Sequence, residues 1–212
     1  KHVDAIYALK LEVIIYALRG GLSNDCYKGV INIRSVDEIQ NKIDFIVVSN
    51  ITSAHEATIM SVIELKCPIL IEKPVLSDEK NASLISAKLK QENILTYVAC
   101  NLRFHSGLQF FKKYLDERQP RINEVNIYCG SYLPDWREDI DFRKSYSSNP
   151  QMGGGVHLDL IHELDYCNWI FGSPNNMRSV KRSVSTLKIS SADYANYNLL
   201  YDKFSLNLVL NY

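Results

Sequence analysis

The sequence predicts an α/β fold, in which a Rossmann-like parallel sheet is followed by an α+β domain with a mainly antiparallel sheet. Up to about residue 101, short apolar segments alternate with helical patterns, which is typical of a parallel sheet covered by helices on both faces. After residue 101, segments of alternating polarity follow one another with turn-like punctuation such as "YDKF", which is typical of antiparallel strands. We therefore predict two domains, 1–101 and 102–212.

The elements of the first domain follow from hydrophobic periodicity and from the polar stretches between apolar runs. A loop with Gly20, Gly21 and Gly29 separates its first strand from a short helix that begins at Ser35. The other helices are expected at 2–10, about 53–65 and 77–91, and the strands at 12–18, 44–49, 68–72 and 94–100.

The second domain begins with a helix at 106–118 and contains a long irregular segment from Leu133 to Met152. A helix from about Val156 to Phe171 follows the irregular segment. Strands are expected at 123–131 and at about 177–186, 194–201 and 204–211.

Composition bounds the class of protein. The 212 residues are 46% hydrophobic, which is sufficient for a packed core. The 24 basic and 24 acidic residues cancel, and no run of like charge is present, so neither nucleic acid nor an anionic membrane is expected as a partner. The longest apolar runs, such as "FIVVS", are far shorter than the roughly 20 residues that cross a bilayer, and no signal peptide precedes them. A cytoplasmic protein is expected.

Five cysteines are widely spaced, with no C-x-x-C pair and no histidine at a metal-ligand spacing. This pattern predicts reduced thiols, most of them small core residues, and no metal site. The cysteines are Cys26, Cys67, Cys100, Cys129 and Cys167.

Polar residues follow two of the predicted parallel strands. Ser49 and Asn50 end the strand at 44–49, and Thr52 or Ser53 can cap the next helix, leaving backbone N–H groups for an anion. His55 lies in the first turn of that helix, where a neutral imidazole packed on a ligand is favoured over a charged one. The alternative is ordinary turn and capping chemistry.

The segment Glu72-Lys73-Pro74 follows the strand at 68–72, so the sheet brings it to the same edge as Asn50. Pro74 restricts Lys73 to extended conformations, which aims its ammonium group at a cleft, where it could bind a substrate oxygen and assist proton movement. The alternative is an exposed salt bridge beside a turn proline.

Three glycines at 153–155 precede the helix at about 156–171. Ionisable side chains occupy one arc of this helix, apart from the apolar arc. Asp159 and His162, at i and i+3, are expected to hydrogen-bond, so that the carboxylate orients the imidazole. His157 is expected to be a loop or packing residue, and the whole polar arc could instead be a solvated face. The arc comprises Asp159, His162, Glu163 and Tyr166.

The strand-end segments "SNITSAH" and "EKP", followed by "GGG" and a helix with Asp and His, resemble the Gfo/Idh/MocA family of nicotinamide-dependent oxidoreductases over essentially the whole chain. The resemblance implies a domain for NAD(P) and a second domain that binds substrate. It implies that Lys73 is the catalytic lysine, and that Asp159 and His162 are the catalytic carboxylate and imidazole. The implied cofactor contacts are Ser49, Asn50, His55, Glu72, Lys73, Pro74, Asn101 and Arg103.

The segment from Gly130 to Tyr166 is similar to a subgroup associated with bacterial surface-sugar pathways. Side chains in it that could contact a sugar-like substrate or the cofactor are Tyr132, Trp136, Arg137, Arg143 and Tyr166. Arg19 follows the strand "VIIYAL" where an acidic residue would bind a ribose 2′-hydroxyl, so the sequence leans towards NADP, although Arg19 could be a solvated loop residue.

Two features depart from the family pattern. His162 follows Asp159 by three residues instead of four, and the first strand with its G-x-G-x-x-G turn would lie before Lys1. We therefore expect a chain truncated at both ends that, as given, binds NAD(P) weakly or not at all. The intact protein is expected to transfer a hydride between NAD(P) and a secondary alcohol or ketone of a sugar-like substrate, and to form a homo-oligomer through its open sheet. The alternative is a non-catalytic protein that binds a sugar nucleotide or a partner, or an inactive fragment.

Overall fold

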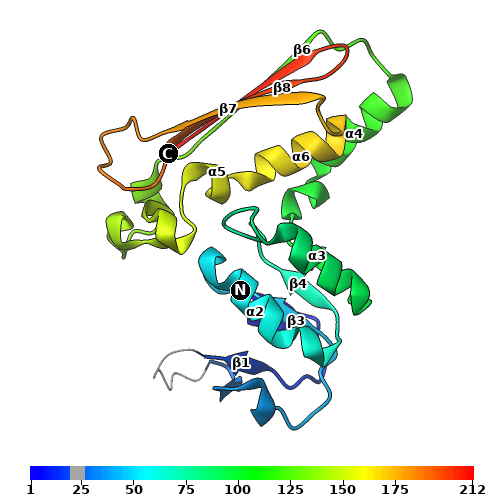
Figure 1. Ribbon diagram of the computed structural model, residues 1–212, viewed down its shortest axis with the longest axis vertical. Helices are drawn as coiled ribbons and strands as arrows, with labels where there is room; N and C mark the ends of the chain where they lie inside the picture. The colour runs from blue at the N-terminus through cyan, green and yellow to red at the C-terminus, as the bar shows by residue number, and fades with distance from the viewer. Residues whose placement is uncertain (20–26) are drawn as a thin grey trace. The chain divides into compact units, whose positions relative to one another are not determined.

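The computed structural model describes residues 1–19 and 27–212 (Figure 1). The chain divides into two compact units, Lys1–Asp44 and Phe45–Tyr212. Their parallel sheets are Rossmann-like, and the second unit adds a mixed sheet in which most neighbouring strands are antiparallel. The predicted fold class is confirmed. Cys26, Gly20 and Gly21, which the sequence analysis named, lie outside the described residues.

The first unit consists of helix α1 (His2–Ala8), strands β1 (Tyr16–Leu18) and β2 (Ile31–Ile33), and the 3-10 turn η1 (Val36–Glu38). The two strands pair in parallel. Strand β2 was not predicted from the sequence, because its segment lies between Gly29 and Ser35, in a stretch interpreted as a polar loop before a short helix. The hydroxyl of Tyr7 donates to the carbonyl of Lys28 at 2.7 Å, which ties α1 to the segment before β2.

The parallel sheet of the second unit has the strand order β3-β4-β5, and all three strands were predicted. Most of the buried side chains in this region are isoleucine, valine or leucine, as expected for parallel strands that helices cover. The bounds are β3 (Ile46–Val48), β4 (Ile69–Ile71), β5 (Thr96–Val98), η2 (Thr52–Ala54), α2 (His55–Val62), η3 (Ile63–Leu65), α3 (Ala82–Gln91) and η4 (Asn101–Phe104).

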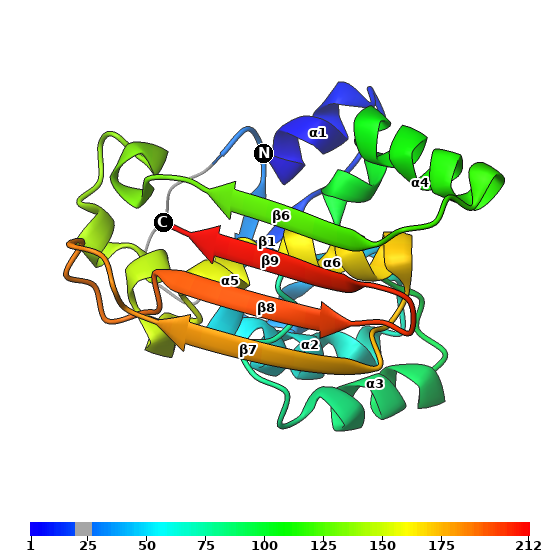
Figure 2. The same cartoon turned by 90° about the horizontal axis from the view of Figure 1, so that it is seen from above.

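The mixed sheet has the order β6-β9-β8-β7, as Figure 2 shows, with β6 parallel to β9 and the other neighbours antiparallel. Between β6 and α5 the chain forms four short 3-10 turns instead of regular structure. The bounds are α4 (Ser106–Arg118), β6 (Glu124–Gly130), η5 (Leu133–Trp136), η6 (Phe142–Lys144), η7 (Tyr146–Ser148), η8 (Pro150–Met152), α5 (Val156–Asp159), α6 (Ile161–Phe171), β7 (Asn176–Arg182), β8 (Tyr194–Leu200) and β9 (Ser205–Asn211).

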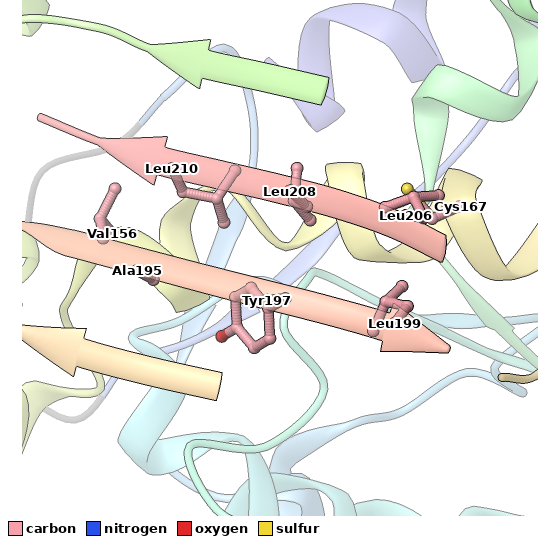
Figure 3. Close-up of a cluster of buried hydrophobic side chains, with 8 residues drawn as sticks. All are labelled: Val156, Cys167, Ala195, Tyr197, Leu199, Leu206, Leu208 and Leu210. Atoms are coloured by element: carbon pink, nitrogen blue, oxygen red, sulfur yellow. The ribbon is translucent and has the colours of Figure 1, made fainter. Parts of the chain in front are cut away.

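Alternation along β8 and β9 builds the core of this region. Every second side chain of each strand is buried, and these side chains pack against α5 and α6 on one face of the sheet (Figure 3). The cluster comprises Val156, Cys167, Ala195, Tyr197, Leu199, Leu206, Leu208 and Leu210. Asp159 and His162 are thus carried by helices that pack on the sheet.

The single helix expected at about 156–171 is in fact two helices. Leu160, with φ −98° and ψ 32°, leaves the helical region and separates α5 from α6. The break also changes which side chains share a face: Glu163 is 8% exposed, and Tyr166 packs against the core cluster. The predicted polar arc of four ionisable side chains is therefore wrong, because it assumed a continuous helix.

The change from a parallel to a mixed sheet occurs between β5 and β6, whereas the two compact units divide at Asp44. The domain boundary at residue 101 stays a prediction. Within residues 1–19 and 27–212, no helix has the length and apolar character needed to cross a membrane.

Candidate active site

Polar residues follow β3 and β4 at one edge of the parallel sheet. Ser49 and Asn50 are exposed, and the Asn50 side-chain amide donates to the Thr58 hydroxyl at 2.8 Å. Glu72 and Lys73 follow β4, and the Lys73 backbone N–H donates to the Glu72 carboxylate at 3.3 Å. The Lys73–Pro74 peptide is cis, and Pro74 is buried. The register of β3 and β4 brings these segments together, as predicted from parallel strands.

His55 joins the two strand-end segments. Its imidazole is 1% exposed, with Nδ1 3.0 Å from the Pro74 carbonyl and Nε2 3.1 Å from the Asn50 carbonyl. Both ring nitrogens therefore face main-chain acceptors. In this buried position the imidazole holds the two segments against each other, so any contribution of His55 to cofactor binding would pass through the segments it holds.

The glycine triplet packs its loop against the start of η2. A Cβ at Gly153 would lie 2.7 Å from the Thr52 Cβ, and a Cβ at Gly154 would lie 2.0 Å from the Tyr146 carbonyl oxygen. Only glycine fits such approaches. The triplet thus brings α5, which carries Asp159, beside the segment that follows β3.

Lys73 reaches α5 directly. Its ammonium nitrogen donates to the main-chain carbonyl oxygen of Asp159 at 2.5 Å, across 86 positions of sequence. The contact joins the end of β4 to the end of α5. Lys73 and Asp159, which the sequence analysis named as catalytic, are therefore adjacent, but through the Asp159 main chain.

The Asp159 carboxylate points to other partners. Asp159 is 5% exposed, and the hydroxyl of Tyr212 donates to its Oδ2 at 2.5 Å. Burial, and then the charge of Asp159, raises the pKa of Tyr212 well above its usual range and also raises the pKa of Tyr146. Two tyrosines thus stay protonated beside this carboxylate.

His162 lies close enough to Lys73 for the lysine charge to change the pKa of the imidazole. Burial, and secondarily the Lys73 charge, lowers the pKa of His162 below 6.5, while Asp165 and Glu72 act in the opposite direction. Its Nδ1 is buried and has no hydrogen-bond partner among residues 1–19 and 27–212. The predicted Asp159–His162 hydrogen bond is absent, because the break at Leu160 turns the two side chains to different surroundings and Tyr212 takes the carboxylate.

Arg103 is held by α6 in a two-point contact. Its Nε and Nη2 donate to the two oxygens of Asp165 at 2.8 Å and 2.5 Å. Burial, and then Asp165, raises the pKa of the neighbouring Cys100 thiol to about 11. Asn101, two residues before Arg103, is exposed.

Arg19 lies in the first unit, just after β1. Its Nε donates to the Asn32 side-chain oxygen at 3.3 Å, and Arg34 Nη1 donates to the Arg19 carbonyl at 3.3 Å. Two guanidinium groups therefore gather where the parallel strands β1 and β2 end. The sequence analysis identified one of them.

The candidate substrate residues differ in environment. Tyr132 is 59% exposed, whereas the indole N–H of Trp136 donates to the Ser131 hydroxyl at 2.7 Å and its ring packs edge-on against Tyr212.

The two candidate arginines contact aromatic rings. The Arg137 guanidinium lies over the Tyr146 ring, 5.1 Å from its centroid. Arg143 is exposed and contacts Asp141 and the Phe142 ring. Tyr166 packs on the core, so no geometric feature supports its predicted contact with substrate.

The structure thus brings Lys73, His162 and Asp159 together, with Arg103 nearby in the same charge network. Sequence reasoning missed Tyr146, Asp165 and Tyr212. Asp165 repeats the three-residue spacing of Asp159 and His162, which was a usable signal. Tyr212 gave none, because an alternating strand carries many such aromatic residues.

Part of the chain is similar to a known family of oxidoreductases. Residues 22–99 match the model of the Gfo/Idh/MocA oxidoreductase family with an NAD-binding Rossmann fold. The levoglucosan dehydrogenase of Pseudarthrobacter phenanthrenivorans is 26% identical over 114 residues, which cover 53% of this chain and 29% of that protein. The inositol 2-dehydrogenase/D-chiro-inositol 3-dehydrogenase of Halalkalibacterium halodurans is 26% identical over 132 residues, covering 61% and 34%.

Solved structures show the same fold. The WlbA dehydrogenase from Bordetella pertussis, solved in complex with NADH and UDP-GlcNAcA, matches with a TM-score of 0.75 at 15% identity, over 86% of this chain and 53% of that one. The chain spans about a third of the length of the two curated relatives. Residues 22–99 are thus similar to the Gfo/Idh/MocA family of oxidoreductases, and the chain shares the fold of the solved dehydrogenase structure.

Proposed function

We propose that the protein is an NAD(P)-dependent oxidoreductase that acts on a secondary alcohol or ketone of a sugar-like substrate in the cytoplasm. The observation that carries the proposal is the cluster of Lys73, Asp159 and His162, contributed by the end of β4 and by α5 and α6. The two curated relatives are named as dehydrogenases of a sugar derivative and of inositols, which supports a polyhydroxylated substrate.

Lys73 would act on the reacting oxygen. An ammonium group carries three N–H donors, and the Asp159 carbonyl occupies one of them. The others could polarise a substrate carbonyl, or stabilise the oxygen of an alcohol as its proton leaves. The Asp159 carbonyl, as the acceptor, sets the direction of the Lys73 ammonium group.

His162 would exchange the proton. Because burial and the Lys73 charge lower its pKa, the imidazole is neutral near pH 7 and can accept a proton from an alcohol. Nδ1 of His162 is buried and has no hydrogen-bond partner among the described residues, so no contact there fixes which ring nitrogen carries the proton. Asp159 would orient Lys73 through its carbonyl, and in this geometry its carboxylate does not orient His162.

The residues present fit a nicotinamide cofactor. Ser49 and Asn50 are exposed at the carboxyl edge of the parallel sheet, the edge where open α/β sheets bind ligands, and Glu72, Pro74, Asn101 and Arg103 follow neighbouring strands. Bound NAD(P) would supply or accept the hydride. In the first unit, the guanidinium of Arg19 would pair with a 2′-phosphate, and this supports the lean towards NADP.

The decisive experiment is Lys73→Met in the full-length protein, with inositols, levoglucosan and UDP-sugars as substrate candidates. We expect turnover to fall by about a thousandfold or more, because the oxygen loses its positioned donor. We also expect the Kd for NAD(P)H, measured by fluorescence titration, to change little. Lys90→Met is the matched control, because Lys90 is exposed on α3.

Near-normal turnover in Lys73→Met would remove Lys73 from catalysis. If the wild-type protein binds a sugar nucleotide but turns over none of the candidates, the non-catalytic binding function is favoured instead. Titration with NADH and NADPH tests the cofactor preference, since tighter NADH binding contradicts the role of Arg19.

We also propose that the protein self-associates through the open face of the mixed sheet. One row across this face runs through Tyr128, Val209, Asn196 and Val180, opposite the face that packs on α5 and α6. Tyr128 is 68% exposed and Val180 is 43% exposed. Sedimentation velocity of Tyr128→Lys is the test, and an unchanged oligomer would contradict the proposal.

A further inference from the structure

The break between α5 and α6 releases one carbonyl oxygen. In a continuous helix the Asp159 carbonyl would accept the backbone N–H of Glu163. Here Glu163 donates instead to the carbonyl of Leu160, at 3.3 Å. The Asp159 carbonyl is thereby available to the Lys73 ammonium, which binds it at 2.5 Å. The interruption at Leu160 therefore provides the acceptor for Lys73.

The same residue is fixed from the mixed sheet. Tyr212 follows β9, its backbone N–H donates to the Asp193 carbonyl at 3.0 Å, and its ring meets Trp136 edge-on at 5.5 Å. The backbone and the ring of Tyr212 are thus both held in place, so its hydroxyl has a fixed direction. That hydroxyl donates to Oδ2 of Asp159 at 2.5 Å, inside a buried setting where such a bond is strong.

The two contacts act on opposite sides of one residue. Tyr212 binds the Asp159 side chain, and Lys73 binds the Asp159 main chain. Because α5 is only four residues long and ends at Asp159, the Asp159–Leu160 peptide keeps one helical hydrogen bond, from the Leu160 N–H to the Val156 carbonyl at 2.9 Å, and its carbonyl accepts none from the helix. The side-chain anchor is therefore important for the direction of the carbonyl.

We propose that Tyr212 is a positioning residue for Lys73: by holding the Asp159 carboxylate, its hydroxyl fixes the peptide whose carbonyl binds the ammonium group. The role of Lys73 in catalysis rests on the function proposed above. The chain of contacts from Tyr212 to Lys73 does not depend on that function.

The test is the rate of amine labelling at Lys73, followed by peptide mass spectrometry of the full-length protein. A bound ammonium is protected, so Tyr212→Phe is expected to raise the labelling rate of Lys73 about threefold or more, relative to Lys90 in the same sample. Tyr197→Phe is the matched control, since Tyr197 is a buried tyrosine of β8 within the same core and outside this chain of contacts. It is expected to leave the rate unchanged.

Two further variants separate positioning from general loosening. Asp159→Ala removes the carboxylate and should match Tyr212→Phe, whereas Asp159→Asn keeps an oxygen acceptor and should label like the wild type. In the double variant Tyr212→Phe/Asp159→Ala, labelling should not exceed that of Asp159→Ala alone, because both changes remove one interaction. If Tyr212→Phe folds poorly, the comparison of Asp159→Ala with Asp159→Asn still tests whether the Asp159 carboxylate is needed to hold Lys73.

Enzyme kinetics provide a second, independent test. Tyr212→Phe is expected to lower kcat about tenfold, while the KM for the cofactor changes less than about twofold, because Lys73 is present but less well directed. Labelling of Tyr212→Phe at the wild-type rate, or labelling effects that multiply in the double variant, would overturn the proposal. Absence of dehydrogenase activity in the wild type would defeat the proposed function only, because the labelling result stands without it.

Discussion

Arg103 and Asp165 form a bidentate ion pair that joins the turn η4 to helix α6. The two hydrogen bonds measure 2.8 Å and 2.5 Å, and the Asp165 side chain is 16% exposed. The carboxylate raises the pKa of Arg103. The pair therefore connects the segment after the parallel sheet to the helix that carries His162, and it lies beside Cys100.

Arg103→Lys should weaken this connection, because an ammonium group cannot reproduce the two parallel hydrogen bonds. We expect a loss of about 1 kcal/mol in the free energy of unfolding, discounted for the partial exposure of Arg103. Asp165→Asn should cost a similar amount, and the double variant should lose no more than the larger single loss. Urea unfolding measures all three.

The same variants test the predicted cofactor contact of Arg103. If the guanidinium acts only through Asp165, both single variants should change the Kd for NADH equally. A weaker Kd in Arg103→Lys alone would show a direct contact with the cofactor.

Three thiols, of which Cys167 is buried and Cys100 and Cys129 are partly buried, should react slowly in the native state. Burial raises the pKa of Cys100 and Cys129 to about 11 and that of Cys167 to about 12, from an ordinary value of 9.0. Because each pKa unit removes about tenfold of the reactive thiolate, alkylation at pH 8 should be about a hundredfold slower than for a free cysteine at Cys100 and Cys129, and about a thousandfold slower at Cys167. Iodoacetamide labelling with and without denaturant measures this ratio. Fast native labelling of Cys167 would contradict its burial.

Stability should fall as the pH drops below 6.5. Burial lowers the pKa of His157 and His162 in the folded protein, so the unfolded chain binds protons more readily than the folded one. The stabilisation is complete above the unfolded pKa of about 6.5 and is lost as the pH falls towards the folded pKa values. Each histidine contributes a slope of at most about 1.4 kcal/mol per pH unit.

Urea unfolding between pH 5 and 8 measures this slope. His162→Gln, which cannot titrate in this range, should flatten the slope by the share of one histidine. An unchanged slope in both His157→Gln and His162→Gln would mean that other groups control the acid sensitivity.

The sequence predicted the elements whose burial follows a simple rule. Strands β3, β4 and β5 were found because each is a short apolar run between polar segments, and Lys73 was placed at the sheet edge because parallel strands end together. Strand β2 was missed because its segment lies between Gly29 and Ser35, in a stretch interpreted as a polar loop. β2 pairs with β1, which is distant in the sequence, and hydrophobic periodicity within one segment does not reveal such a pairing.

The details of the site were less accessible. Helical periodicity assumes a continuous helix, so it could not show that Leu160 interrupts it or that Glu163 turns to the core. The contact of Lys73 with the Asp159 carbonyl involves the main chain, which every residue possesses, so no residue type signals it. Tyr212 lies 53 positions from Asp159, and only the assembled sheet brings them together.

The glycine triplet gives a last test, at the point where the loop before α5 approaches its neighbours. A Cβ at Gly154 would lie 2.0 Å from the Tyr146 carbonyl oxygen and 2.7 Å from that of Ser147, both main-chain atoms that cannot rotate away. Gly154→Ala should therefore displace the loop and cost about 2–4 kcal/mol of unfolding free energy. Gly107→Ala is the control: Gly107 is exposed in the first turn of α4, its Cβ would meet only the His105 side chain at 3.2 Å, and alanine favours a helix by up to about 1 kcal/mol. Thermal unfolding compares the two variants. Equal melting temperatures would show that the loop adapts to a methyl group, and that the triplet does not fix α5 beside the segment that follows β3.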